Sequence, residues 1–138
     1  MTQPPTLAAA MSPFPYAIEA SQTLREARDM MSAHDIHHLP VTQAGELHGV
    51  ITNTDILLAT SLVAGGAANV LVEDTFTEPA YVVDLHSDLA TVVLEMAARR
   101  ISSALVTREG KLAGILTTTD ICLQLGELLG GAPDDEAA

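Results

Sequence analysis

The sequence predicts an α+β fold made of two β-α-β-β-α repeats that pack against each other with pseudo-two-fold symmetry. A gap-free shift of 65 residues places Ala20–Ile56 on Leu85–Ile121 with many identical pairs, among them Leu24/Leu89 and Asp55/Asp120. Within each copy, alternating apolar residues give way to helical spacing and back, as strands and helices require. A unit of roughly 50 residues is too small to bury its sheet alone, so the two copies must cover each other.

Each copy opens with a short extended run, Tyr16–Glu19 in the first and Tyr81–Asp84 in the second. A helix follows: in the first copy it begins with capping-box spacing at Thr23–Glu26, and in the second copy it begins at Asp88. Two strands then flank the dipeptides Ala44-Gly45 and Glu109-Gly110, which predict tight hairpins. The strands and last helices are expected at His38–Thr42, Leu47–Thr52 and Asn53–Leu62, and at Ala104–Thr107, Leu112–Thr117 and Thr118–Leu129.

The repeats set the expected domain boundaries. Gly65-Gly66 separates the halves, so we expect one repeat over residues 7–65 and the other over 66–129. The last residues, 130–138, are acidic and contain a proline, and we expect a flexible tail there.

Composition excludes several classes of function. Six Lys and Arg against eighteen Asp and Glu give a net charge of -12, which repels nucleic-acid backbones and anionic lipids. The apolar stretch from Ile56 to Val72 is interrupted by polar residues and is too short to span a bilayer. The first 24 residues lack the basic start of a signal peptide, so we expect a cytoplasmic protein.

The single cysteine, Cys122, excludes an internal disulfide framework. Its apolar spacing with Ile121 and Leu125 predicts a buried, inert thiol. The sequence has no nucleophile elbow, no Walker loop and no dinucleotide fingerprint after a strand, so we do not expect an enzyme.

The strongest local pattern is Gly49–Asp55, repeated as Gly114–Asp120. In both copies a strand leads into a helix, with Thr at the boundary and Asp three residues later. One interpretation is purely structural, because Thr-x-x-Asp forms a capping box at a helix start. The other is functional, because the carboxylate can accept from a ribose diol while helix amides donate to a phosphate.

Longer segments around this pattern make the chain resemble a tandem pair of cystathionine-β-synthase (CBS) domains, over roughly Leu7 to Leu129. The resemblance implies that an adenosine-containing ligand binds in clefts between the repeats and regulates something else. It also implies a homodimer, with the last helices of both repeats as the expected contacts. The segments that carry it are His34–Val41, Gly45–Gly49 and Gly49–Asp55, and Arg100–Val106, Gly110–Gly114 and Gly114–Asp120.

Carried over by position, the resemblance assigns Asp55 and Asp120 to the ribose hydroxyls, with Thr52 and Thr117 beside them. The first strands would contact the base, and the segments around Pro40 and Leu105 would form the opposite wall. Leu105 departs from the proline found in the first copy. The expected first site comprises Ala17, Ile18, His37, His38, Leu39, Pro40, Ile51, Thr52 and Asp55. The second comprises Val82, Val83, Arg99, Arg100, Ser103, Ala104, Leu105, Leu116, Thr117 and Asp120.

Within these sites, the histidines at the first corner and the arginines at the second are expected to meet a phosphate. The expected ligand is AMP, ADP, ATP or an S-adenosylmethionine-like compound. The scarcity of cations favours AMP or an adenosyl compound over ATP, although a nucleotide could bring Mg²⁺ with it. No cofactor is required, and the regulated partner is a protein of unknown identity. Two alternatives stay open: a ligand-free scaffolding dimer, and a divalent-metal sensor through His34, His37 and His38.

Overall fold

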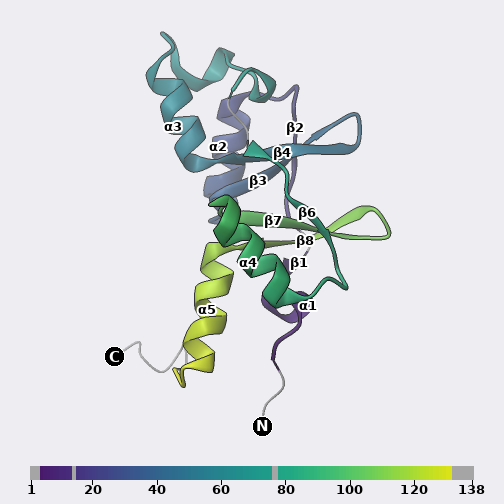
Figure 1. The fold of residues 1–138 in the computed structure, drawn as a ribbon. Coiled ribbons are helices and arrows are strands. Elements are labelled where there is room, and N and C mark those ends of the chain that lie inside the picture. The colour runs from purple at the N-terminus through teal and green to yellow at the C-terminus, as the bar shows by residue number, and fades with distance from the viewer. Residues whose placement is uncertain (1–3, 14, 76–77, 132–138) are drawn as a thin grey trace. The chain divides into compact units, whose positions relative to one another are not determined.

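The computed structural model describes residues 4–13, 15–75 and 78–131. The chain forms two compact units, each built around one repeat (Figure 1). The first-repeat unit spans Pro15–Ala80, and the second-repeat unit combines Met1–Phe14 with Tyr81–Ala138. Both units contain a small sheet and helices, which confirms the predicted α+β class and the two repeats. Most of the tail expected at 130–138 lies outside the described residues, from residue 132 on.

The first-repeat unit holds a four-stranded sheet. In chain order its elements are β2 (Ile18–Glu19), α2 (Leu24–His34), β3 (His38–Gln43), β4 (Glu46–Thr52), α3 (Asn53–Ser61), the 3-10 turns η1 (Gly66–Asn69) and η2 (Val72–Asp74), and β5 (Glu78–Pro79). The strands lie in the order β2-β3-β4-β5. β2 is parallel to β3, because α2 crosses over between them, and the other neighbours are antiparallel.

The second-repeat unit repeats this plan with segments from both ends of the chain. Its elements are α1 (Leu7–Ala10), β1 (Ser12–Pro13), β6 (Val82–Asp84), α4 (Leu89–Arg99), β7 (Ser103–Arg108), β8 (Lys111–Thr117) and α5 (Thr118–Leu128). The sheet order is β1-β8-β7-β6, with β6 parallel to β7. The elements expected from the internal repeat are thus confirmed, whereas α1, β1, β5 and the two 3-10 turns were not expected.

Side-chain caps fix where the long helices begin. Thr23 accepts a hydrogen bond from the backbone N–H of Glu26 (3.2 Å) at the start of α2, as its spacing predicts. Asp88 accepts from the N–H of Thr91 (3.1 Å) and starts α4. Both helices end on a residue in the left-handed region, Asp35 at φ 52° and Arg100 at φ 55°, and such a residue closes many helices.

The two expected hairpins are confirmed, and their turns have the same backbone. Ala44 and Gly45 have φ values of 53° and 82°, and Glu109 and Gly110 have values of 53° and 79°. Two consecutive positive φ values match the right-handed twist of the strands that the turn joins. Glycine accepts this conformation readily, whereas Ala44 and Glu109 adopt it at a steric cost.

Each unit has its own apolar core, and each core includes a residue from outside the expected repeat. Val72 (0% exposed) belongs to the core of the first-repeat unit, although the sequence boundary placed it in the second half. Leu7 (1% exposed) belongs to the core of the second-repeat unit, although it lies at the start of the chain. Met11 also packs so closely over Gly114 that a Cβ at that position would collide with its side chain.

The compact units therefore add segments to the repeats expected at 7–65 and 66–129, whose boundaries stay a prediction. Gly65 and Gly66 do form a turn, with φ values of 95° and 72°, but the chain then returns to the first sheet. Leu71 bridges to Thr23, and β5 pairs with β4. The physical reason is the sheet edge, because β4 and β8 each offer unpaired backbone groups to a passing segment.

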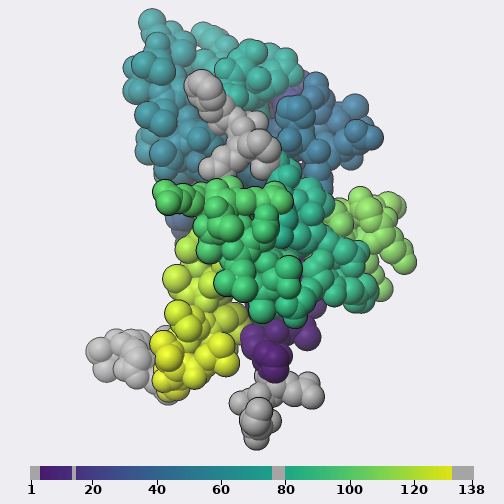
Figure 2. Space-filling model, in the orientation of Figure 1, coloured from purple at the N-terminus to yellow at the C-terminus, as the bar shows by residue number. Residues whose placement is uncertain are grey.

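Two expectations about the chemistry of the chain can be compared with the structure. Cys122 is exposed, so the prediction of a buried thiol is wrong. The helix carries it on a face that its own unit does not cover: no residue of α5 is buried, and α5 lies at the surface in Figure 2. None of the helices in the described part of the chain is long and apolar enough to cross a membrane.

Candidate functional site

The candidate site of the first-repeat unit is the corner where β4 leads into α3. Thr52 is the N-cap, and its Oγ1 accepts a hydrogen bond from the N–H of Asp55 (3.2 Å). In return, Asp55 Oδ2 accepts from the N–H of Thr52 (2.9 Å). The capping box proposed from the sequence is thus present.

The same corner occurs where β8 leads into α5. Asp120 Oδ2 accepts from the N–H of Thr117 (2.9 Å) and from its hydroxyl (3.0 Å). The capping role alone does not use up either carboxylate, because an ionised carboxylate offers about four acceptor positions. At the first corner, the hydrogen bond that Asp55 accepts among the described residues is on Oδ2.

The helix amides at this corner are less available than the sequence suggested. The N–H of Thr52 is bound to Asp55, and the N–H of Asn53 donates to the carbonyl of His37 (3.1 Å). At the second corner, the N–H of Thr118 likewise donates to the carbonyl of Ser102 (3.1 Å). The first amides of both helices thus already have backbone or side-chain acceptors, and phosphate binding by the helix amides stays a prediction.

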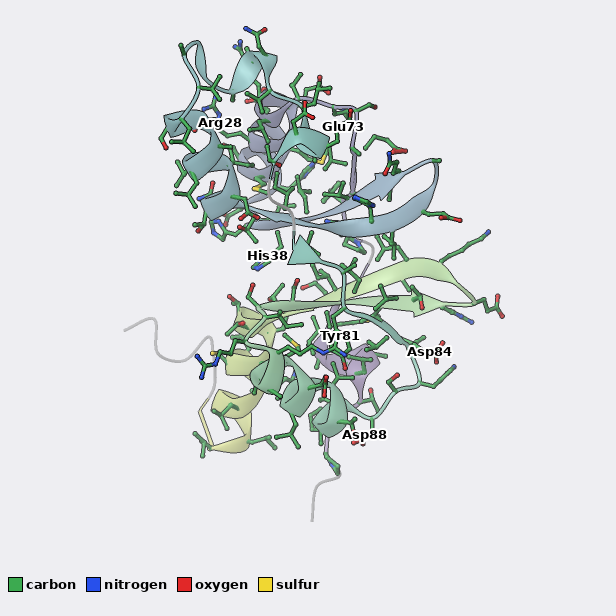
Figure 3. The ribbon with its side chains drawn as sticks, turned by 45° about the horizontal axis from the view of Figure 1, so that its top comes forward. Arg28, His38, Glu73, Tyr81, Asp84 and Asp88 are labelled. Atoms are coloured by element: carbon green, nitrogen blue, oxygen red, sulfur yellow. The ribbon has the colours of Figure 1, made fainter. Side chains whose placement is uncertain are left out.

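The structure brings the expected histidines to the first corner. His38 faces Thr52 across the β3–β4 ladder, at the start of β3 (Figure 3), and is half-buried. His37 precedes it and is exposed. At the second corner Ser103 faces Thr117 in the same register, and it is the buried polar residue of its unit, 5% exposed. His38 and Ser103, which were both expected in the sites, therefore lie directly opposite Thr52 and Thr117 in their sheets.

The expected wall residues of the sites are mostly core residues of their own units. Ile18, Leu39 and Ile51 lie in the first core, and Val83, Ala104 and Leu116 lie in the second. Their side chains are already covered, so within its unit each offers a ligand chiefly its backbone. Pro40 and Leu105 are also buried, Ala17 is half-buried, and Val82 is 45% exposed.

The two arginines of the second corner differ in what they contact. The Nε of Arg99 donates to Glu95 (2.6 Å), and its guanidinium lies 4.4 Å above the ring centre of Tyr81. Arg100 closes α4, and its side chain is exposed. Of the pair, Arg99 is partly committed to neighbours within its unit, and Arg100 is the cation better placed to meet a phosphate.

An aromatic contact at the end of the first long helix has its counterpart in the second repeat. Tyr16 stacks on His34, with ring centres 3.6 Å apart and planes 11° from parallel, and Tyr81 and Arg99 occupy the matching positions. Sequence reasoning aligned the two tyrosines but gave them no role. The signal was their spacing to His34 and Arg99, which is the same in both repeats.

The metal-sensor alternative finds little support in this geometry. Across the described ranges, no group of three or more His, Cys, Asp or Glu side chains lies close enough to hold a metal ion. His34 ends α2 and is stacked on Tyr16, whereas His38 begins the next strand beyond the left-handed Asp35. The helix does not continue to His38, so these histidines do not share one face.

One contact at the second corner was missed altogether. The hydroxyl of Ser12, in β1, donates to Asp120 Oδ1 at 3.2 Å. No sequence signal pointed to it, because the two residues belong to different repeats by the internal alignment.

Beside the first corner, a cavity of about 280 Å³ lies along α3, and Asp55 is one of its lining residues. It is lined by Asp55, Leu58, Ala59, Leu62, Val63, Val70, Asp74 and Thr75.

Comparison with known proteins shows similarity over most of the chain. A family model described as "CBS domain" matches twice, over residues 7–61 and 72–127. The chain is 31% identical, over 112 residues, to "Hypoxic response protein 1" of Mycobacterium tuberculosis, a match covering 77% of this chain and 75% of that protein. A crystal structure of Hypoxic Response Protein I with two coordinated zinc ions is 28% identical (TM-score 0.70; 86% of this chain, 97% of that chain).

Two further solved structures carry adenosine compounds. The CBS domain of a bacterial CNNM/CorC family Mg²⁺ transporter in complex with ATP is 25% identical (TM-score 0.74; 89% of this chain, 86% of that chain). The CBS domain pair of protein MJ0100, in complex with 5-methylthioadenosine and S-adenosyl-L-methionine, shares the fold (24% identical, TM-score 0.75; 91% of this chain, 100% of that chain).

Proposed function

The chain belongs to the CBS domain family, and from that membership we propose that it is a regulatory sensor of an adenosine-containing ligand. The observation that carries the proposal is the Thr–Asp corner, which recurs with the same hydrogen bonds in both units. Relatives of the same fold support the class of ligand, because one of them is in complex with ATP. The position of each site in a cleft between the repeats stays a prediction.

In the proposed complex, the chemistry divides between two kinds of group. The carboxylates of Asp55 and Asp120 accept from the hydroxyls of the ribose, since a carboxylate can take two donors at once. His37, His38 and Arg100 meet the phosphate edge, and backbone groups of the first strands meet the base. A charged nucleotide must rely on these few side chains, because the first amides of α3 and α5 already have acceptors.

This count of donors favours a ligand with little phosphate charge. The chain has six Lys and Arg in all, and Arg99, one of the two at the second corner, is bound to Glu95. AMP or an S-adenosylmethionine-like compound therefore fits better than ADP or ATP, whose extra phosphates need further cations or Mg²⁺. We infer a regulatory rather than an enzymatic role, because the family that the chain matches is a ligand-binding one.

The signal is proposed to pass through a homodimer to a protein partner. Helix α3 with its C-cap residue Leu62, and helix α5, expose apolar surface that is not covered within their own units: Leu57 (60%), Leu62 (83%), Leu125 (54%) and Leu128 (65%). Ile56, expected on this contact face, is instead buried in the core (1% exposed). Leu125→Glu is expected to yield a folded monomer in light scattering, and a monomeric wild-type protein would contradict this part of the proposal.

The proposal is tested by a thermal-shift series with AMP, ATP, S-adenosylmethionine and Zn²⁺. A ligand that binds only the folded state stabilises it, by about 2.7 kcal/mol at a hundred times its Kd. We expect AMP or S-adenosylmethionine to raise the melting temperature, and Asp55→Ala with Asp120→Ala to abolish the shift. Asp88→Ala is the matched control, because it removes a helix cap but no proposed ligand contact.

Two outcomes would contradict the proposal. The absence of a shift with every adenosine compound would favour the ligand-free scaffold. A melting-temperature shift with Zn²⁺ alone, lost in the His37→Ala/His38→Ala protein, would favour the metal sensor. Zinc is included because the similar Hypoxic Response Protein I coordinates two zinc ions.

A further inference from the structure

Ser12 links the start of the chain to the ribose anchor of the second repeat. It lies in β1, which pairs antiparallel with β8 so that Ser12 stands opposite Ile115. Its hydroxyl donates to Asp120 Oδ1 at 3.2 Å, and both residues belong to the same compact unit. The contact joins two segments that are remote in the sequence, so it depends on how the unit folds.

The surrounding packing holds Ser12 in this place. Leu7 and Ala10 of α1 are buried in the core of the second-repeat unit, at 1% and 7% exposure. Met11 fills the space above Gly114, where any larger residue would collide with it. The backbone of β1 is therefore anchored on both sides of the hydroxyl, whereas the Ser12 side chain itself is exposed and free to turn.

The acceptors of Asp120 are nearly all in use. Of its roughly four acceptor positions, two on Oδ2 are taken by the amide and hydroxyl of Thr117. One on Oδ1 is taken by Ser12. A ribose diol needs two acceptors, so a sugar that binds here must displace a donor. Ser12 is the donor on Oδ1, the oxygen that the capping box does not use, so it can leave without opening the helix cap.

We propose that Ser12 is a positioning residue of the second site, and that its hydroxyl occupies the place on Asp120 that one sugar hydroxyl of the ligand takes. The inference rests on the proposed function, because it supposes that Asp120 receives a ribose. It adds a determinant of specificity: because Ser12 competes for Asp120, the sugar hydroxyls contribute less binding free energy at the second site. Ligand binding at Asp120 then also breaks the hydrogen bond from Ser12, which is one of the contacts that hold the N-terminal segment in place.

The experiment compares AMP with 2′,3′-dideoxy-AMP, which lacks both sugar hydroxyls, by calorimetry on the full chain. All Ser12 variants are made in the Asp55→Ala protein, called the parent, so that the calorimeter measures binding at the second site only. Ser12→Ala removes the competing hydroxyl, and Ser12→Thr keeps it as the matched control. Melting curves without ligand check that each variant is folded.

We expect Ser12→Ala to tighten AMP binding about tenfold, because a hydrogen bond to a charged group no longer has to be broken. The affinity for 2′,3′-dideoxy-AMP should not change, and Ser12→Thr should keep the parent's values. A purely structural role of Ser12 would shift both ligands together. If the parent binds AMP too weakly to measure, Ser12→Ala should bring binding into range.

An unchanged or weaker affinity for AMP in Ser12→Ala, or an equal change for both ligands, would overturn the proposal. The proposed function survives that result if the parent binds AMP and the Asp55→Ala/Asp120→Ala protein does not. If the wild-type protein binds neither AMP nor S-adenosylmethionine, the proposed function fails, and the role of Ser12 fails with it.

Discussion

At the scale of single residues, Asp55 and Asp120 have two roles that do not exclude each other. Oδ2 of each carboxylate closes a capping box, and Oδ1 of Asp120 accepts from the hydroxyl of Ser12. A cap needs one oxygen, whereas a sugar diol needs a further acceptor. The structural and the functional interpretations of the motif therefore predict different consequences of the same substitution.

Replacing Asp55 by Ala is expected to cost about 1 kcal/mol of unfolding free energy, the usual price of a lost helix cap. Asp88→Ala should cost a similar amount, because it also removes a carboxylate that accepts a backbone N–H at a helix start, from the N-cap position of α4 instead of the N3 position. Urea denaturation measures both values. A much larger loss in Asp55→Ala alone would mean that this carboxylate has a structural role beyond the cap.

Gly114 lies directly against Met11 of the N-terminal segment. A methyl group there would meet the Sδ and Cε atoms of Met11, the flexible end of that side chain, so Gly114→Ala is expected to destabilise the protein by about 1 kcal/mol, at the low end of overpacking. Gly126→Ala in α5 is the control, because nothing lies within 4 Å of its new methyl group. That change should stabilise the helix by up to about 1 kcal/mol in the same denaturation experiment. Equal effects of the two substitutions would contradict the packing argument.

At the scale of elements, the two β-hairpins show how a turn sets the register of its strands. Both turns place two consecutive residues at positive φ, and both hairpins have the same register shift, between Val41 and Thr42 and between Val106 and Thr107. The register carries Thr52 opposite His38, and Thr117 opposite Ser103. A slip of one residue would turn these side chains to the other face of the sheet and would dismantle the candidate corners.

The cost of a non-glycine residue in this turn can be measured directly. Glu109 adopts φ 53°, which Asn tolerates better than Glu, so Glu109→Asn should stabilise the hairpin by about 0.5–1 kcal/mol. The same substitution at Gln43, before the other turn, is the control, because Gln43 is not among the residues at positive φ. A loss of stability in Glu109→Asn would show that the Glu109 side chain contributes more than its backbone strain costs.

Sequence reasoning succeeded for elements with strong periodicity or caps and failed for the short ones. The amphipathic stripe of α4 and the cap at Asp88 predicted that helix, whereas α1 has four residues and shows no periodicity. The two-residue strands β1 and β5 left no pattern, whereas β2, which is equally short, was expected as part of the repeat. The contact between Ser12 and Asp120 follows from these short elements, so it could not be predicted. Cys122 was predicted wrongly because helical spacing shows which residues share a face but does not show whether that face is covered.

At the scale of the whole molecule, each repeat is completed by a segment that the sequence alignment assigns elsewhere. Residues around Val72 and β5 complete the first-repeat unit, and Leu7 with β1 completes the second-repeat unit. Neither edge strand is contributed by the β-α-β-β-α core of its own repeat. The internal repeat is therefore a unit of sequence, whereas the compact unit is the repeat together with its added edge.

This arrangement predicts where a truncation acts. Deleting residues 1–13 should raise amide exchange in β8, around Gly114 and Ile115, because β8 loses its partner β1 and the core loses Leu7. Exchange in β2, which lies close to the cut in the sequence, should change little. Hydrogen-exchange mass spectrometry resolves the two regions, and faster exchange confined to β2 would contradict the assignment of β1 to the second-repeat unit.

The central claim is that both Thr–Asp corners bind an adenosine-containing ligand, and calorimetric titration with AMP tests it most directly. We expect one equivalent of AMP for each repeat in the wild-type protein and in Asp88→Ala. Asp55→Ala and Asp120→Ala should each lose one of these equivalents, and the double variant should lose both while it remains folded. Equal binding in the wild-type protein and the folded double variant, or no binding in either, would contradict the account.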